Sequence, residues 1–151
     1  MLKLSKKTLY AIEAVLDVAY HMGAQPVQSR DITRRQGIPR RYLEQALQQL
    51  VKADILVGVR GPKGGYRLAR ERRRITVGEI VRVIAGDDGA DELLEDTSGS
   101  DLGIKVVRPL WADLREAAMV RLDQTTIDEM CLKANQSGVE SEGRPNLDFT
   151  I

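Results

Sequence analysis

Apolar residues recur at helical spacing along much of the chain. The first helix is predicted to follow the N-cap residue Ser5 and to end at Gly23, with one buried stripe made of Leu9, Ile12, Val15, Leu16, Ala19 and Met22. Ser29 is expected to cap a second helix over residues 30–36, which Gly37 terminates. A third helix is predicted from Pro39 to Val51, with an inward stripe of Leu43, Ala46, Leu47 and Leu50.

Two short alternating segments, 55–59 and 66–69, flank the glycine-rich loop Gly61-Pro62-Lys63-Gly64-Gly65. This pattern predicts a β-hairpin with basic side chains at its tip. The resulting order of helix, turn, helix and hairpin is that of a winged helix-turn-helix, in which one helix enters the major groove of DNA and the hairpin reaches the adjacent backbone or minor groove.

The second half predicts further helices around an acidic loop. Thr76 and Glu79 form a capping box that opens a helix through Ala85, and Thr126 and Glu129 open a short final helix around 130–134. Residues 101–125 keep a heptad-like spacing, so we expect a long helix that packs against a second copy of the chain; a helix folded back on its own domain is the alternative. The expected dimerisation residues are Ile104, Val107, Trp111, Leu114 and Ala118.

These elements predict a mostly α-helical fold with a small β-hairpin wing. The expected division is a winged helix-turn-helix domain over 1–86, an acidic loop over 87–100, a dimerisation helix and a short terminal helix over 101–134, and a flexible tail over 135–151.

The composition, with 42% hydrophobic and 30% charged residues among 151, is that of an ordinary soluble protein. No apolar run approaches the roughly 18 residues of a membrane span, the N-terminus is unlike a signal peptide, and there is a single cysteine, Cys131. We therefore expect a cytoplasmic protein without a disulfide framework.

The net charge of +1 hides a strong asymmetry. Residues 1–74 contain 16 Lys and Arg against 6 Asp and Glu, whereas residues 75–151 contain 7 against 16. A basic half that also carries the winged-helix pattern predicts contact with a polyanion.

Candidate DNA-binding side chains follow from this arrangement. Arg40, Arg41 and Gln45 lie in the first turns of the third helix, where their forked donors and acceptors match guanine and adenine edges. A solvated face with an Arg40–Glu44 pair is the alternative. Arg60 and Lys63 at the wing tip suit a narrow minor groove. Lys6, in the first turn of the first helix, suits either a phosphate contact or a solvated helix end.

Four segments, SKKTLYAIEAVLDVA, ITRRQGIPRRYLEQALQQL, VRGPKGGYRLA and ITVGEIVRVI, together resemble the family of winged-helix regulators that includes IscR, NsrR, RirA and CymR, and IscR-like members most. The resemblance spans roughly residues 1–134 and implies a homodimer on a partly palindromic operator. By matching position it implies major-groove contacts by Arg40, Arg41, Tyr42 and Gln45, a minor-groove contact by Arg60 and the loop Gly61 to Gly65, and phosphate contacts near Ser5 and Lys6.

The chain departs from the IscR-like pattern at the iron–sulfur site. The three cysteine positions of that [2Fe–2S] site correspond here to Leu93, Gly99 and Lys105, and the histidine position to Arg108. None of these side chains supplies a thiolate or imidazole ligand, so we expect no cluster and no other cofactor.

The remaining cysteine and the single histidine lie elsewhere. We expect Cys131 to be a small buried hydrophobe, with a disulfide or a shared metal between two copies as the alternative. His21 is expected to be a surface or helix-end residue rather than a ligand.

The leading hypothesis is therefore a dimeric, sequence-specific transcriptional regulator, and a repressor because operator occupancy blocks polymerase. Its signal is left open among a small-molecule effector, a protein partner and oxidation of Cys131. The alternative is a protein-interaction module with only weak nonspecific DNA binding. An enzyme is not expected, because the GPKGG segment lies between strands rather than before a helix and no nucleophile motif accompanies His21.

Overall fold

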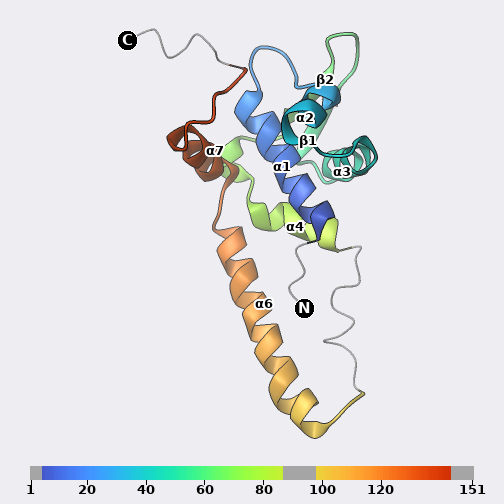
Figure 1. Ribbon diagram of the computed structural model, residues 1–151, viewed down its shortest axis with the longest axis vertical. Coiled ribbons are helices and arrows are strands. Elements are labelled where there is room, and N and C mark those ends of the chain that lie inside the picture. Colours follow the sequence, from blue (N-terminus) through green and yellow to red (C-terminus); the bar gives the residue numbers. More distant parts are fainter. Residues whose placement is uncertain (1–4, 87–97, 144–151) are drawn as a thin grey trace.

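The computed structural model describes residues 5–86 and 98–143. In Figure 1 a compact domain stands above one long protruding helix. The elements are α1 (Lys6–His21), α2 (Ser29–Gln36), α3 (Arg40–Lys52), β1 (Leu56–Val59), β2 (Gly65–Leu68), the 3-10 turn η1 (Arg72–Arg74), α4 (Val77–Ala85), the π-helical turn η2 (Gly103–Val107), α6 (Arg108–Asp123) and α7 (Ile127–Gln136). This is the mostly helical fold with a small hairpin that the sequence predicts.

Helix α1 is the centre of the domain, because α2, α3, α4, β2 and α7 all contact it. Ser5 caps it, its Oγ accepting from the Thr8 amide at 3.2 Å. The predicted buried stripe is wrong at Leu9, which is 43% exposed, and it omits Ala11, Ala14 and Val18, which are fully buried. A helix surrounded by five elements buries a wide arc, and small residues let the neighbouring helices approach closely.

The helix-turn-helix has the predicted boundaries within one residue. Gly37 ends α2 in the left-handed conformation (φ 66°), and its amide donates to the Thr33 carbonyl at 2.9 Å. Ser29 is not the N-cap but the first residue of α2, and the N-cap residue Gln28 makes no side-chain capping bond. The predicted inward residues of α3 are all buried: Leu43, Ala46, Leu47 and Leu50.

The wing is a two-stranded antiparallel hairpin in which Leu56 pairs with Leu68 and Val59 with Gly65. Val27 pairs with the outer side of β2 as an isolated antiparallel bridge. It exchanges two backbone hydrogen bonds with Tyr66, at 3.0 and 2.7 Å. The segment before α2 is therefore joined directly to the wing.

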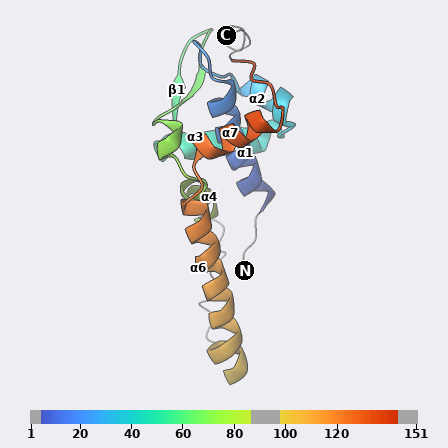
Figure 2. The ribbon, with the colours of Figure 1, turned by 90° about the vertical axis from the view of Figure 1, so that its left-hand side faces the viewer.

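The C-terminal half is joined to the domain at one short junction. Thr76 and Thr126 cap α4 and α7 as predicted, each accepting from the amide three residues later. Two backbone hydrogen bonds join the starts of these helices: the Val77 amide donates to the Thr125 carbonyl and the Ile127 amide donates to the Ile75 carbonyl, both at 2.9 Å. In Figures 1 and 2, α6 leaves this junction away from the domain, whereas α7 lies across α1.

The predicted tail begins too early. Asn135 and Gln136 belong to α7, and residues 139–143 contact the end of α1, whereas 144–151 lie outside the described residues. Most of the predicted acidic loop, 87–97, also lies outside them. None of the helices within 5–86 and 98–143 combines the length and the apolar character of a membrane-spanning segment.

Leu50→Ala is expected to lower the free energy of unfolding by roughly 2–5 kcal/mol, because Leu50 is fully buried and the substitution leaves a cavity. Gln48→Ala, on the exposed face of the same helix, is the matched control and should change it by less than about 0.5 kcal/mol. Urea unfolding at one protein concentration measures both. Equal effects of the two substitutions would contradict the assignment of the buried face.

Candidate nucleic-acid interface

The outer face of α3 presents the predicted recognition side chains to solvent. Arg40, Arg41, Tyr42 and Gln45 are all exposed. Arg40 Nε donates to Glu44 Oε1 at 3.0 Å, so the predicted intrahelical pair forms in the DNA-free protein. Because Arg40 is 86% exposed, this pair is fully solvated and leaves the guanidinium able to change partners.

Tyr42 also lies against an aromatic residue of another helix. Its ring lies 6.0 Å from the ring of Tyr10 on α1, and 44% of the residue remains exposed. Tyr42 is therefore both part of the outer face of α3 and part of the contact between α3 and α1.

Some residues of the wing tip are exposed to solvent, and others pack against the backbone. Arg60, Gly61 and Lys63 are exposed at the tip, where Gly61 has φ 109° and accepts a hydrogen bond from the Gly64 amide at 2.9 Å. Gly64 is buried, and Gly65, with φ 154°, lies so close to the Val27 carbonyl that a side chain would overlap it. Both glycines shape the hairpin and line the cleft beside it.

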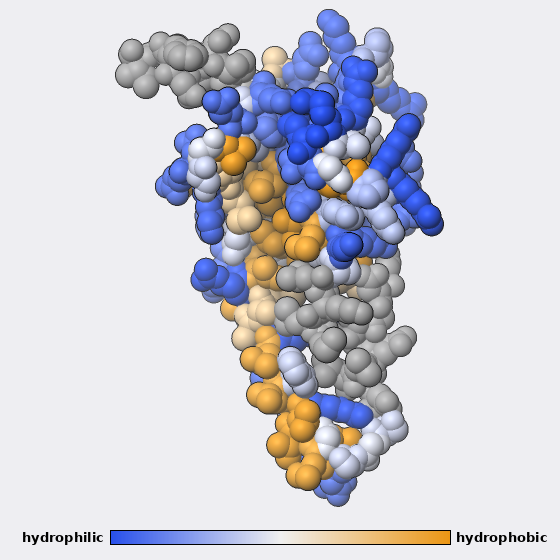
Figure 3. Space-filling view, in the orientation of Figure 1, coloured by the Kyte–Doolittle hydropathy of each residue, from blue (hydrophilic) through white to orange (hydrophobic). Residues whose placement is uncertain are grey.

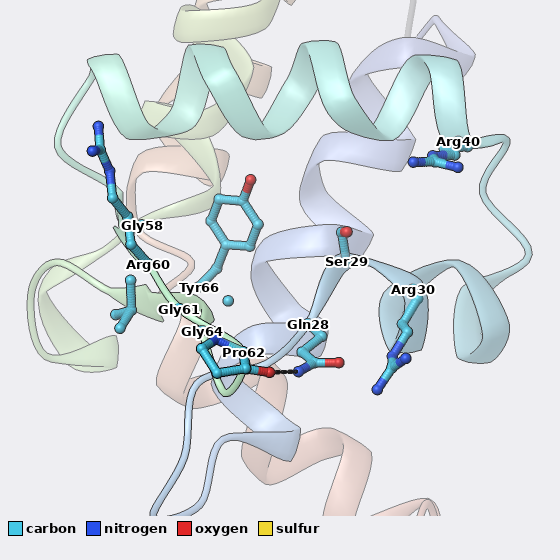
Figure 4. Close-up of a pocket in the computed structure, with 12 residues that line it drawn as sticks. Gln28, Ser29, Arg30, Arg40, Gly58, Arg60, Gly61, Pro62, Gly64 and Tyr66 are labelled. Atoms are coloured by element: carbon cyan, nitrogen blue, oxygen red, sulfur yellow. Dashed lines mark hydrogen bonds between the residues drawn. The ribbon is translucent and has the colours of Figure 1, made fainter.

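A cleft of about 620 Å³ separates the wing from the start of the helix-turn-helix. Figure 4 shows Arg30, Arg40 and Arg60 around it, from α2, α3 and the wing. Gln28 Nε2 donates to the Pro62 carbonyl across the cleft at 3.4 Å. Three guanidinium groups from separate elements make a basic cleft suited to an anionic backbone.

Arg30 is not among the residues that the sequence predicts to contact DNA. Its position at the start of α2, where the helix dipole disfavours a cation, was the available signal. At the start of α1, Lys6 is exposed as predicted, whereas the Ser5 hydroxyl is already engaged as the helix cap.

Several arginines of the basic half are tied to the protein itself. Arg67 donates to the Ala24 carbonyl at 2.6 Å, Arg70 pairs with Glu79 at 2.6 Å and Arg72 pairs with Asp128 at 2.8 Å. The charge excess of residues 1–74 therefore serves the fold as well as the outer surface.

The long helix carries an apolar stripe that the other described residues leave largely uncovered. None of the residues of η2 or α6 is fully buried, and Val107, Trp111 and Leu114 are 45–48% exposed. Ile104 and Ala118 are half-buried. In Figure 3 an orange band runs along this helix toward the domain. The alternative that this helix folds back on its own domain does not describe the chain.

Two of the residues at positions that correspond to cluster ligands in IscR-like proteins, Lys105 and Arg108, make other contacts here. Lys105 Nζ lies 3.9 Å from an Asp101 carboxylate oxygen, and Arg108 donates to the Ser98 carbonyl next to Gly99. Leu93 lies outside the described residues. Cationic side chains engaged in this way do not fit as iron ligands. Within 5–86 and 98–143, no group of three or more His, Cys, Asp and Glu side chains is arranged to hold a metal.

Cys131 is buried at 3% exposure, as predicted for a small apolar residue. His21 is at the end of α1, so of the two expected positions, surface or helix end, the second is the one observed; its side chain is only 7% exposed. Burial of the imidazole lowers the pKa of His21, and the nearby Asp17 carboxylate opposes this shift with a smaller effect.

The fold, the exposed face of α3 and the basic cleft beside the wing define a DNA-binding protein of the winged helix-turn-helix class. Residues 4–133 match the Rrf2 family, described as "Iron-dependent Transcriptional regulator". The chain belongs to this family and is a DNA-binding transcriptional regulator, as the sequence motifs indicated. The family and the relatives are regulators rather than enzymes, and they do not favour the protein-interaction alternative.

Sequence relatives cover nearly the whole chain. The HTH-type transcriptional regulator IscR of Vibrio campbellii is 35% identical over 99% of this chain and 88% of its own length. IscR of Escherichia coli O1:K1 / APEC is 37% identical over 95% of this chain and 87% of its own length.

Two solved structures have the same fold. IscR of T. potens is 36% identical with a TM-score of 0.73 and covers 93% of both chains. CymR, the global cysteine regulator of B. subtilis, is 29% identical with a TM-score of 0.72 and covers 88% of this chain and 98% of its own. Both agree with the predicted kinship to IscR and CymR.

Proposed function

We propose that the chain acts as a homodimeric repressor on a partly palindromic operator, without an iron–sulfur cluster. Arg40, Arg41, Tyr42 and Gln45 read the major groove, and Arg60 with the loop from Gly61 to Gly65 enters the adjacent minor groove. Ser5 and Lys6 lie near phosphate. The observation that carries this proposal is the basic cleft between the exposed start of α3 and the wing.

The test begins with selection from a randomised duplex pool by the metal-free protein. An enriched palindrome, bound more weakly as salt rises, is the expected result, because phosphate contacts release counterions. Binding that remains blind to sequence would contradict the proposed readout.

Arg60→Ala is expected to cost on the order of 1 to 3 kcal/mol of binding to the selected duplex, because it removes the wing contact. Lys6→Ala should weaken binding to every sequence about equally and reduce the salt slope by roughly one. Fluorescence anisotropy with selected and scrambled duplexes at two salt concentrations separates these outcomes. Unchanged operator binding by Arg60→Ala would show that the wing assignment is wrong.

The homodimer is proposed from the apolar stripe of η2 and α6. Removing such an apolar face from water is favourable, and the same face on a second copy supplies an apolar surface that can cover it. Dimerisation would also place two recognition helices on two half-sites, which explains why a palindromic operator is expected.

Leu114→Glu should convert the dimer to a monomer of about 16.8 kDa, because it places a charge within the stripe. Leu132→Glu is the matched control, since Leu132 is 57% exposed on α7, outside the stripe. Sedimentation equilibrium measures the mass of each variant. A dimer that survives Leu114→Glu with unchanged affinity would place the interface elsewhere.

The proposed signal does not pass through a cluster on residues 93, 99, 105 and 108. A small-molecule effector, a protein partner and oxidation of Cys131 stay open as its source. Each would act on the affinity of the dimer for its operator, the quantity that decides whether polymerase is blocked.

Protein purified under anaerobic conditions is expected to lack visible iron–sulfur absorbance and stoichiometric iron, because the corresponding side chains supply no thiolate. Absorption spectra and iron analysis check this. A coloured protein with stoichiometric iron would overturn the expectation, and Cys131→Ser would then show whether the cysteine holds that iron.

A further inference from the structure

The segment after α7 returns to the end of α1 and lies against it. We call residues 139–143 the C-terminal strap. The Tyr20 hydroxyl donates to the Val139 carbonyl, the Ser141 hydroxyl donates to the Tyr20 carbonyl at 2.6 Å, and the Glu142 amide donates to His21 Nδ1 at 3.1 Å. The lowered pKa of His21, caused by its burial, keeps Nδ1 unprotonated and able to accept this bond near neutral pH.

Two glycines permit this close approach. A Cβ at Gly143 would overlap the carbonyl of His21, and a Cβ at Gly23 would lie 2.5 Å from the carbonyl oxygen of Gly143. The backbone of the strap therefore packs directly on the turn that follows α1.

The Glu142 carboxylate extends from the strap to the end of α2. Its Oε2 lies 2.9 Å from Arg34 Nη2 and 2.6 Å from Arg35 Nη1. Hydrogen bonds from Arg34 and Arg35 lower the pKa of Glu142 to about 2. The carboxylate is consequently charged at every pH used for DNA binding.

Arg35 is held on its other side by a buried carboxylate. Asp17 on α1 is completely buried, and its two oxygens accept from Arg35 Nε at 2.9 Å and Arg35 Nη2 at 2.8 Å. Gln36 Nε2 donates to the same carboxylate at 2.7 Å. The last turn of α2 is thus fixed to α1, with the arginine between Asp17 and the strap.

This turn leads straight into the recognition helix. Only residues 37–39 separate α2 from α3, and Ile38 among them is fully buried. A displacement at Arg35 would therefore be passed to Arg40 and Arg41 rather than absorbed by a loose connection.

We propose that Glu142 is a positioning residue for DNA recognition, which acts through Arg35 and its buried partner Asp17 to fix the end of α2 and the direction in which α3 begins. The inference rests on the proposed role of α3 in reading the operator. It makes the C-terminal strap a working part of the DNA-binding domain, although it is more than 100 residues away from α2 along the chain.

Two substitutions release the strap by different means. Glu142→Gln removes the charge that holds Arg34 and Arg35, and Gly143→Ala prevents close packing on His21 without any change of charge. Each should reduce the ratio of affinities for the selected and scrambled duplexes on the order of tenfold, because α3 loses its fixed starting direction. Glu140→Gln is the matched control, since Glu140 is exposed and makes no ion pair with any described residue.

Affinities for both duplexes are measured at one salt concentration, together with thermal unfolding of each variant. Loss of folded protein would weaken binding to both duplexes equally, so the ratio reports positioning. A ratio that is unchanged in both variants would overturn the inference. A common rise in both affinities with Glu142→Gln would also overturn it, because it would show that Glu142 only masks two cations. If the wild-type protein itself shows no sequence preference, the proposed readout by α3 fails instead.

Discussion

The packing of neighbouring elements around α1 is the constraint on which the rest of the structure depends. Its buried positions include Ala11, Ala14 and Val18, and their small size lets α3 and α4 approach the helix closely. Helix α3, for which recognition of DNA is proposed, the wing strand β2 and the returning helix α7 all pack against this one element. A change in the packing of α1 would therefore affect both the DNA-binding face and the C-terminal half.

The second constraint is the junction between residues 75–78 and 123–127, which sets the direction of the long helix. Two backbone hydrogen bonds join the segments, and Arg82 pairs with both oxygens of Asp123 at 2.5 and 2.6 Å. Gly78 lies against the same carboxylate, where a side chain would overlap it. In a dimer formed through α6, this junction would fix the distance between the two recognition helices, and hence the spacing of half-sites that the protein accepts.

The sequence predicted those elements whose burial has a simple period. Helix α3 buries one narrow stripe, so spacing located Leu43 and Leu47 correctly. The same reasoning misplaced Leu9 on α1, because a central helix is covered on several sides. It could not predict the contact between Arg35 and Glu142, since no periodicity relates residues 107 positions apart. For the candidate interface, the tip residues followed from turn chemistry, whereas Arg30 needed the geometry of the cleft.

Arg40 and Arg35 form ion pairs that differ in how readily the two charges can separate. The Arg40–Glu44 pair is exposed and lies within one helix, so it contributes only about 0.3–0.5 kcal/mol and leaves Arg40 able to make the contacts with DNA proposed for it. The Arg35–Asp17 pair is different, because its carboxylate is fully buried and separation would leave a charge without compensation. Arg35 is thereby committed to the fold and Arg40 remains available. The contrast between Arg35 and Arg40 thus follows from the burial of the partner carboxylate and not from the count of basic residues.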